Sequence, residues 1–275
     1  MIGQKQLKEQ FNTLIVHNRL PKSMLLIGLT GSGRKTFANW VSAEMGIPSI
    51  EINNGIDDIR ELIELSNKSV KETLYIVPNI EQMSAAAQNS LLKVLEEPPK
   101  NAYFILTATQ ENLVLSTIHS RCVVFYMDHY GTEELLEYAK TYISELDDAT
   151  ITLITDVCSC PGEVQTLLGF DVAAFYKYAE QVFNNIAKVS GANSFKIGNK
   201  INLADDGKKY DLTLFWKLFV YLCMSNIDNN MPKYSVGVKI TMRALQDLRI
   251  KGINKQMLFD TWILNIRKEW LNADN

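Results

Sequence analysis

The stretch LIGLTGSGRKTF, residues 26–37, joins a short apolar run to a glycine-rich turn and the start of a helical pattern. A strand, a glycine-rich turn and a helix N-terminus together form a phosphate-binding loop, because glycines let backbone N–H groups approach an anion. Gly28, Gly31 and Gly33 stand at the glycine positions of such a loop. The stretch therefore predicts an α/β fold with a loop of phosphate-binding ancestry after a strand.

The residues that should bind phosphate and magnesium do not fit the loop pattern. With the glycines aligned, Arg34 stands at the lysine position and Lys35 at the position of the magnesium-binding hydroxyl. Shifting by one residue aligns Lys35 and Thr36 but places Leu29 and Arg34 on glycine positions. Arginine replaces this lysine poorly, because its planar guanidinium approaches phosphate differently from an ammonium.

The loop is accordingly interpreted as degenerate, and two readings stay open. In one, it binds ATP or ADP weakly; in the other, it is a glycine-rich turn without a ligand. Its candidate binding residues are Gly28, Gly31, Gly33, Arg34, Lys35 and Thr36.

Apolar runs of strand length alternate with helical patterns through the first half of the chain. Five runs rich in β-branched and aromatic residues are typical of buried strands, namely 24–28, 49–53, 74–78, 103–109 and 122–127. Helical patterns lie between them at 36–45, 55–68 and 84–97. This alternation predicts a three-layer α/β domain with a mostly parallel sheet over residues 1–127.

The pattern turns helical after residue 128. We expect a small helical domain over 128–170, with helices near 131–146 and 147–160. A second, all-helical domain is expected over 171–275, with turns at 205–209 and 225–233. Its helices are expected at 171–190, 212–225, 236–252 and 254–270.

Composition narrows the class of protein. The 275 residues are 47% hydrophobic and 21% charged, which is typical of a soluble protein with a substantial core. The formal net charge of −3 argues against an autonomous nucleic-acid binder. The most apolar stretch, 212–224, is too short to span a bilayer and contains Lys217. The first eleven residues show an amphipathic helix pattern rather than a secretory signal, so we expect a cytoplasmic protein.

Cysteine spacing predicts no metal site. Of the four cysteines, only Cys158 and Cys160 lie close together, with no second pair at the spacing of metal ligands. Reduced and mostly buried thiols are the expected state.

The run 74–78 lacks the acidic end that hydrolysis needs. In ATPases with a phosphate loop, the third strand ends in an acid that binds magnesium, and a second acid orients the attacking water. Here Pro78 and Asn79 stand at those positions, and Glu81 lies three residues beyond the magnesium position. Proline has no ligating side-chain atom and an amide is no general base, so the run argues against hydrolysis.

Residues 74–122, LYIVPNIEQMSAAAQNSLLKVLEEPPKNAYFILTATQENLVLSTIHSRC, resemble the clamp-loader branch of the AAA+ family. The resemblance is closest to the delta-prime members from bacterial DNA polymerase III and covers the first 127 residues well. It implies a RecA-like AAA+ domain, a helical lid over 128–170 and a helical collar, used for oligomerisation, over 171–275. Members form an open ring of five subunits that loads the sliding clamp onto primed DNA.

The resemblance also assigns residue roles. Ser120, Arg121 and Cys122 match the S-R-C motif of the family, so Arg121 takes the place of an arginine finger that acts in trans on a neighbour's ATP. The alternative for Arg121 is a surface salt bridge. Thr107 and Thr109 fall near the family's first sensor. Residues 161–163 have no basic side chain where active relatives carry a second sensor arginine.

These departures together imply a stator that does not hydrolyse ATP and has no tightly bound cofactor. The implied partners are the tau/gamma ATPase and delta subunits, and indirectly the sliding clamp and primed DNA, with no membrane. No zinc module is expected, since residues 37–73 contain no cysteine. One alternative is an active AAA+ ATPase with a divergent phosphate loop in a clamp-loader-like assembly. Another is a scaffold in a different AAA+ assembly.

Overall fold

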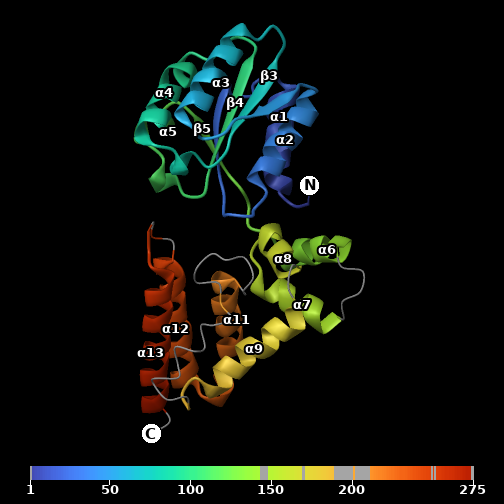
Figure 1. The fold of residues 1–275 in the computed structure, drawn as a ribbon. Helices are drawn as coiled ribbons and strands as arrows, with labels where there is room; N and C mark the ends of the chain where they lie inside the picture. The colour runs from blue at the N-terminus through green and yellow to red at the C-terminus, as the bar shows by residue number, and fades with distance from the viewer. Residues whose placement is uncertain are drawn as a thin grey trace. The chain divides into compact units, whose positions relative to one another are not determined.

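The structure, a computed structural model, shows a parallel sheet covered by helices, followed by a region built of helices (Figure 1). The part of the chain that it describes comprises residues 2–142, 148–168, 171–188, 201, 211–248, 250 and 252–273.

The sheet has five strands in the order β2-β3-β4-β1-β5, and all neighbours run parallel. The strands are β1 (Ser23–Ile27), β2 (Ser49–Glu51), β3 (Thr73–Val77), β4 (Ala102–Ala108) and β5 (Val123–Tyr126). All five expected strands are thus confirmed. Every residue of β1 and β3 is buried, as expected for inner strands of a sheet that is covered on both faces.

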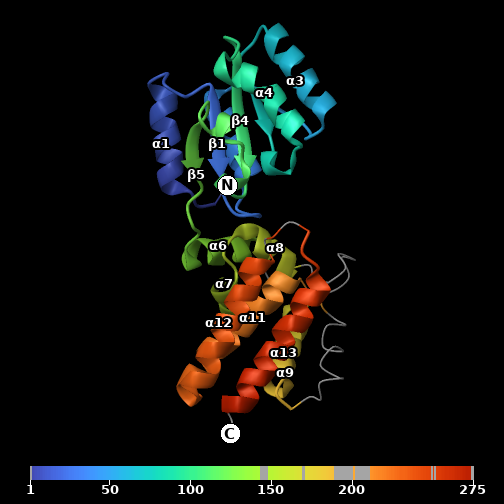
Figure 2. The same cartoon turned by 90° about the vertical axis from the view of Figure 1, so that its left-hand side faces the viewer.

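Helices cover both faces of the sheet (Figure 2). They are α1 (Lys5–Val16), α2 (Arg34–Met45), α3 (Ile56–Lys68), α4 (Ala85–Glu96) and α5 (Ser116–His119). Successive side chains of β1 point to opposite faces: Met24 packs with residues of α1 and α2, whereas Leu25 packs with residues of α3, α4 and α5. The predicted three-layer α/β arrangement is therefore confirmed.

Local sequence signals set several helix ends in this part. Gly46 ends α2 with a φ of 65°, in the left-handed region that glycine adopts without strain. The Ser84 hydroxyl accepts a hydrogen bond of 3.2 Å from the amide of Ala87 and so caps α4. One end differs: α2 begins at Arg34, two residues before the expected start. The first turn of α2 therefore contains Arg34, Lys35 and Thr36.

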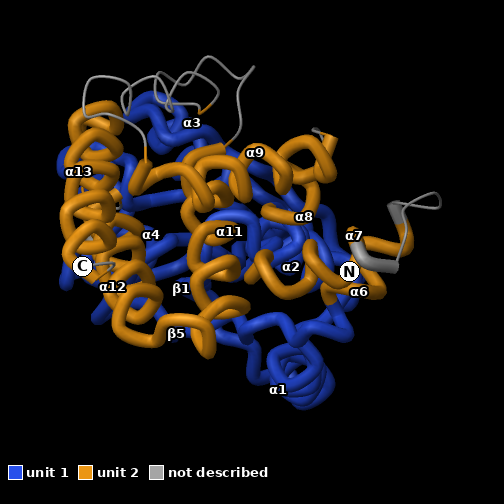
Figure 3. Tube along the Cα trace, turned by 90° about the horizontal axis from the view of Figure 1, so that it is seen from below, with its two compact units in different colours: residues 1–134, 160–162 blue, residues 135–159, 163–275 orange. Residues whose placement is uncertain are grey.

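The chain divides into two compact units, which Figure 3 shows in two colours. Unit 1 contains Met1–Glu134 and the short segment Cys160–Gly162. Unit 2 contains Leu135–Ser159 and Glu163–Asn275. The finer expectation, a lid over 128–170 and a collar over 171–275, stays a prediction.

Unit 2 is helical in the part that the structure describes. Its helices are α6 (Thr132–Tyr142), α7 (Asp148–Val157), α8 (Pro161–Leu168), α9 (Val172–Asn185), α11 (Leu212–Ser225), α12 (Met231–Asp247) and α13 (Lys255–Ala273); the first residues of α6 and α8 belong to unit 1. The expectation of a turn over 225–233 is wrong at its end, because α12 begins at Met231. Asn230 caps α12 by accepting a hydrogen bond of 3.1 Å from the amide of Lys233, and Pro232 stands in its first turn. The turn expected at 205–209 lies outside the described residues.

Aromatic side chains form the core of unit 2. Phe219 meets Trp262 edge to face, with ring centroids 4.9 Å apart. The indole N–H of Trp262 donates to the Thr241 hydroxyl over 3.0 Å, which satisfies this buried donor. The apolar stretch 212–224 is accordingly a buried helix, α11. Within the described residues, no helix combines the length and the apolar character needed to cross a membrane.

Candidate nucleotide site and candidate arginine finger

The glycine-rich loop leaves β1 at the edge of the sheet where parallel strands end. The amide of Gly28 donates a hydrogen bond of 3.0 Å to the carbonyl of Ala108, so the loop starts level with the end of β4. Asn79 and Glu81 follow β3 at the same edge, and Thr109 follows β4. Because open parallel sheets bind ligands outside the carboxyl ends of their strands, this edge is the candidate nucleotide site.

Arg34, at the lysine position of the loop, turns inward and is only 9% exposed. Its Nη1 donates to the carbonyl of Gly28 and its Nη2 donates to Oδ1 of Asn79, each over 2.8 Å. Burial lowers the pKa of Arg34, and the negative charge of Glu81 opposes this shift. The guanidinium thus ties the first residue of the loop to the end of β3.

Asn79 is held from several sides at the position where an ATPase carries an acid. Its backbone adopts a φ of 50°, its amide donates to the Thr107 hydroxyl over 3.1 Å, and its carbonyl accepts from the Asn54 side chain over 3.4 Å. Thr107, expected near the first sensor, therefore binds the backbone of Asn79. Sequence reasoning judged Asn79 only as a poor base and missed its role as the acceptor for Arg34.

Lys35 is engaged at the end of a different strand from the one that Arg34 reaches. Its ammonium forms an ion pair of 2.5 Å with Glu51 at the end of β2, and its side chain is 60% exposed. Thr36 is also exposed. Both cations of the predicted loop are therefore paired with protein groups.

The carbonyls of three successive loop residues accept hydrogen bonds from later parts of unit 1. Thr30 accepts from the thiol of Cys160 over 3.3 Å. Gly31 accepts from the amide of Gly162 over 3.0 Å. The carbonyl of the third residue, Ser32, accepts from the Tyr130 hydroxyl over 2.7 Å. The loop is thus covered by its own chain along this side.

The acidic side chains near the site are engaged as well. Glu81 accepts from the amide and the hydroxyl of Thr109 on one oxygen, over 3.1 and 2.8 Å. Its other oxygen is buried and has no hydrogen-bond partner in the described part of the chain, as is the case for the Ser32 hydroxyl. In unit 2, Glu163, one of the residues that the sequence aligns with the second sensor, accepts from Lys217 over 2.6 and 2.7 Å.

Arg121 stands in the turn between α5 and β5. Its Nε and Nη2 both bind one carboxylate oxygen of Glu96, over 2.8 and 2.7 Å, and its Nη1 donates to the carbonyl of Thr117 over 3.0 Å. Sequence reasoning allowed for a salt bridge at Arg121 but missed Glu96. The available signal was a carboxylate at the end of a helix just before two prolines, which carries no information about a partner 25 residues away.

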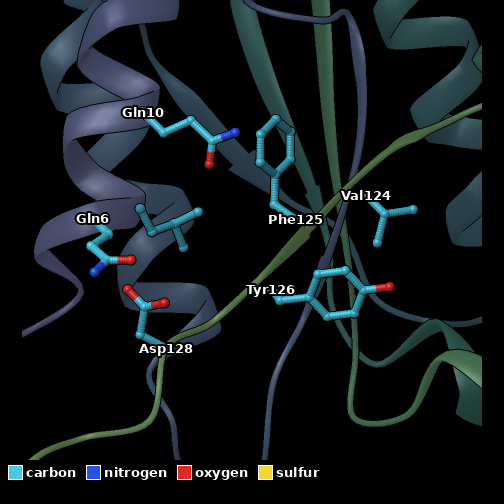
Figure 4. A pocket seen from close by; sticks show the side chains of 7 residues that line it. Gln6, Gln10, Val124, Phe125, Tyr126 and Asp128 are labelled. Atoms are coloured by element: carbon cyan, nitrogen blue, oxygen red, sulfur yellow. The ribbon is translucent and has the colours of Figure 1, made fainter.

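A shallow hollow of about 270 Å³ lies elsewhere, between α1 and β5 (Figure 4). Its lining consists of Gln6, Leu7, Gln10, Val124, Phe125, Tyr126 and Asp128. None of the site residues expected from the sequence lines this hollow. None of the four cysteines forms a disulfide, and the described residues contain no group of three or more histidine, cysteine, aspartate or glutamate side chains placed to hold a metal ion.

Comparison with known proteins identifies the relatives of this chain. Residues 47–130 match the family model described as DNA polymerase III, delta subunit. A DNA polymerase III subunit delta' from Buchnera aphidicola subsp. Baizongia pistaciae is 30% identical over 225 residues, which cover 80% of this chain and 63% of the relative. A subunit gamma/tau from Mycoplasma genitalium is 29% identical over 167 residues, or 50% of this chain and 28% of the relative. The chain thus spans less than two thirds of the length of these relatives.

Solved structures agree on the fold. A gamma subunit-related protein of DNA polymerase III from Thermotoga maritima superposes with a TM-score of 0.50 at 19% identity, over 95% of this chain and 99% of that one. The RuvB branch migration motor from the same organism gives a TM-score of 0.52 at 17% identity, over 96% of this chain and 87% of that one. At these identities the likeness concerns the fold alone. The sequence matches, for their part, support a member of the AAA+ clamp-loader family close to the delta-prime subunits of DNA polymerase III.

Proposed function

We propose that this chain is a non-hydrolysing stator subunit of a DNA polymerase III clamp loader. In this role it presents Arg121 to the ATP of a neighbouring subunit while the sliding clamp is loaded onto primed DNA. The observation that carries the proposal is the inward turn of Arg34, which binds Gly28 and Asn79 where a working loop would direct a cation at phosphate.

The residues of the loop do not fit a magnesium-bound triphosphate. Arg34 and Lys35 are engaged by Asn79 and Glu51, and no hydroxyl stands at the magnesium position in the register that Gly28, Gly31 and Gly33 define. Pro78 replaces the acid that would bind the metal after β3, and the amide of Asn79 replaces the acid that would orient the attacking water. We therefore propose no hydrolysis by this chain and at most weak binding of ATP or ADP. These same observations weigh against an active ATPase with a divergent loop.

Arg121 retains donors for a ligand outside the chain. A guanidinium has five N–H groups, and Glu96 with Thr117 takes three of them. The side chain is 29% exposed, so part of it can be approached from outside. An arginine supplied in trans stabilises charge on a transferring phosphoryl group and raises the rate by about 10³–10⁵-fold where it has been measured.

Exposed apolar side chains on α13 support assembly with other subunits. Met257, Leu264 and Leu271 are 62%, 45% and 43% exposed and repeat every seven residues, which places them on one face of the helix. By contrast, Ile263 and Trp270 of the same helix are buried in the core of unit 2. The proposed partners are the tau/gamma ATPase and delta subunits, and indirectly the sliding clamp and primed DNA.

The test is Arg121→Ala in a reconstituted loader that contains the neighbouring tau/gamma ATPase. We expect the rate of ATP hydrolysis and clamp loading to fall by at least about a hundredfold while the complex still assembles. Arg60→Ala is the matched control, because Arg60 is an exposed arginine of unit 1 paired with Asp57. Unchanged hydrolysis in the Arg121 variant would remove the finger. Magnesium-dependent turnover by the isolated chain would instead favour the active ATPase.

A further inference from the structure

The carboxylate that binds Arg121 lies at the end of a helix that is distant in sequence and anchored to the sheet. Glu96 is the last residue of α4, and the prolines at 98 and 99 prevent the helix from continuing. The residue before it, Leu95, is 2% exposed, and its carbonyl accepts a buried hydrogen bond of 2.9 Å from the hydroxyl of Ser23 in β1. The backbone that carries Glu96 is therefore fixed to the central part of the sheet.

The backbone that carries Arg121 is anchored to the same strand. The amide of Arg121 donates to the carbonyl of Ile118 over 3.0 Å, and Val123, two residues further on, pairs with Met24 of β1. Two adjacent residues of β1, Ser23 and Met24, thus hold the two chain segments whose side chains meet. The ion pair between Glu96 and Arg121 joins two rigid parts of the structure.

The geometry of the pair leaves the guanidinium ordered and still able to bind an anion. Glu96 accepts from Nε and from one N–H of Nη2, and Thr117 accepts one N–H of Nη1. One N–H remains on each terminal nitrogen, and each can donate to a phosphate oxygen. An unrestrained arginine side chain loses rotamer freedom when it binds phosphate, which costs free energy. The Arg121 side chain is already held by Glu96 and Thr117, so this cost is smaller.

We propose that Glu96 is a positioning residue that sets the direction of Arg121 toward the phosphate of the neighbouring subunit. This inference rests on the proposed role of Arg121 as a finger in trans. Glu96 itself touches neither the nucleotide nor the reacting atoms; it acts through the guanidinium. Without Glu96, Arg121 keeps its charge but is no longer held in one orientation. A catalytic group that is out of position loses most of its stabilising effect on a transition state.

The experiment measures steady-state ATP hydrolysis by the reconstituted loader with Glu96→Ala, Glu96→Gln and Arg121→Ala. We expect Glu96→Ala to lower kcat about tenfold with the KM for ATP unchanged, since the lost interaction serves the transition state alone. Glu96→Gln keeps an acceptor oxygen and should recover most of the rate. Glu97→Ala, which removes the adjacent exposed carboxylate, should match the parent.

The double variant Glu96→Ala/Arg121→Ala separates this inference from the proposed function. If Glu96 acts through Arg121, the double variant should be no slower than Arg121→Ala alone. A further loss in the double variant, or an Arg121 effect without any Glu96 effect, would overturn the positioning role and leave the finger standing. A higher rate in Glu96→Ala would overturn it too, since Glu96 would then compete with phosphate. An Arg121→Ala variant at the parent's rate would remove the finger itself. Glu96 is 59% exposed, so we expect these variants to fold, and circular dichroism checks this.

Discussion

Gly31 and Gly162 meet backbone to backbone, although they lie far apart in the sequence. The amide of Gly162 donates to the carbonyl of Gly31 over 3.0 Å, and a Cβ built on Gly162 would lie 2.5 Å from the Cα of Gly31. Real Cβ atoms do not approach other atoms so closely. This pair of glycines is therefore what allows the segment 160–162 to lie on the glycine-rich loop.

We expect Gly162→Ala to lower the free energy of unfolding by about 2 kcal/mol through this clash. Gly162 stands in the first turn of α8, where alanine would otherwise favour the helix, so a loss of stability identifies the close approach. Gly46→Ala is the control: it has a φ of 65° but no neighbour within 4 Å of its Cβ, and should cost about 1 kcal/mol from backbone strain alone. Urea unfolding followed by tryptophan fluorescence, to which Trp40 contributes in unit 1, measures both. Equal stability of Gly162→Ala and the parent would contradict the packing.

Replacing Arg34 by lysine should destabilise the protein although it restores the loop's usual residue. Lysine cannot reach Gly28 and Asn79 with a fork of two donors, so both acceptors would lose their partner. We expect the free energy of unfolding to fall by about 1–3 kcal/mol. Lys35→Ala removes an exposed ion pair in the next position and should change it by less than about 1 kcal/mol. A more stable Arg34→Lys variant would show that the guanidinium is not a structural tie.

Sequence patterns predicted the elements well because their causes are local. Apolar runs marked the strands, and single residues such as Ser84 and Gly46 marked helix ends through their own hydrogen bonds and φ angles. The start of α12 was missed because Pro232 suits both a turn and the first turn of a helix.

The sequence did not predict which side chains that lie far apart in the chain contact one another. The loop pattern showed that Arg34 stands in an unusual position, but its acceptor Asn79 lies 45 residues away. Arg121 was singled out by its motif, whereas Glu96 carries no motif. Contacts of this kind depend on which strands are neighbours in the sheet, and no local spacing encodes that order.

The ion pair of Lys217 and Glu163 should contribute strongly to the stability of unit 2. Both side chains are about one fifth exposed, at 21% and 22%, and Lys217 also donates to the Ser159 hydroxyl over 2.9 Å. Lys217→Met leaves a largely buried carboxylate without its cation, and we expect a loss of about 2–4 kcal/mol. Lys68→Met removes the exposed pair with Glu64 and should cost less than about 1 kcal/mol. Tryptophan fluorescence during urea unfolding follows both units, through Trp40 in unit 1 and through Trp216, Trp262 and Trp270 in unit 2. A loss for Lys217→Met no larger than that for Lys68→Met would contradict this prediction.

Alkaline conditions should destabilise the protein through Cys122. Burial raises the pKa of the Cys122 thiol to about 12 in the folded state, whereas the pKa of a cysteine in the unfolded chain is about 8.5. The stabilising contribution is therefore complete below about pH 8.5 and is lost as the pH rises toward 12. The serine in Cys122→Ser does not lose a proton in this range, so the free energy of unfolding of the variant should fall less steeply with pH than that of the parent. We expect the two slopes to differ by about 1 kcal/mol per pH unit above pH 9. Urea midpoints from pH 7 to 10.5 test this, and parallel curves for the two proteins would refute it.

Helix α4 runs between the candidate nucleotide site and the candidate arginine finger. The short segment η1 (Ile80–Gln82) leads from Asn79 to the Ser84 cap at one end of the helix, and Glu96 holds Arg121 at the other. With 12 residues, α4 is a rod about 18 Å long. We expect α4 to transmit a displacement of Asn79 to the guanidinium of Arg121. Since Arg34 fastens Asn79 internally, we expect Arg121 to keep one position whatever the nucleotide concentration around the protein.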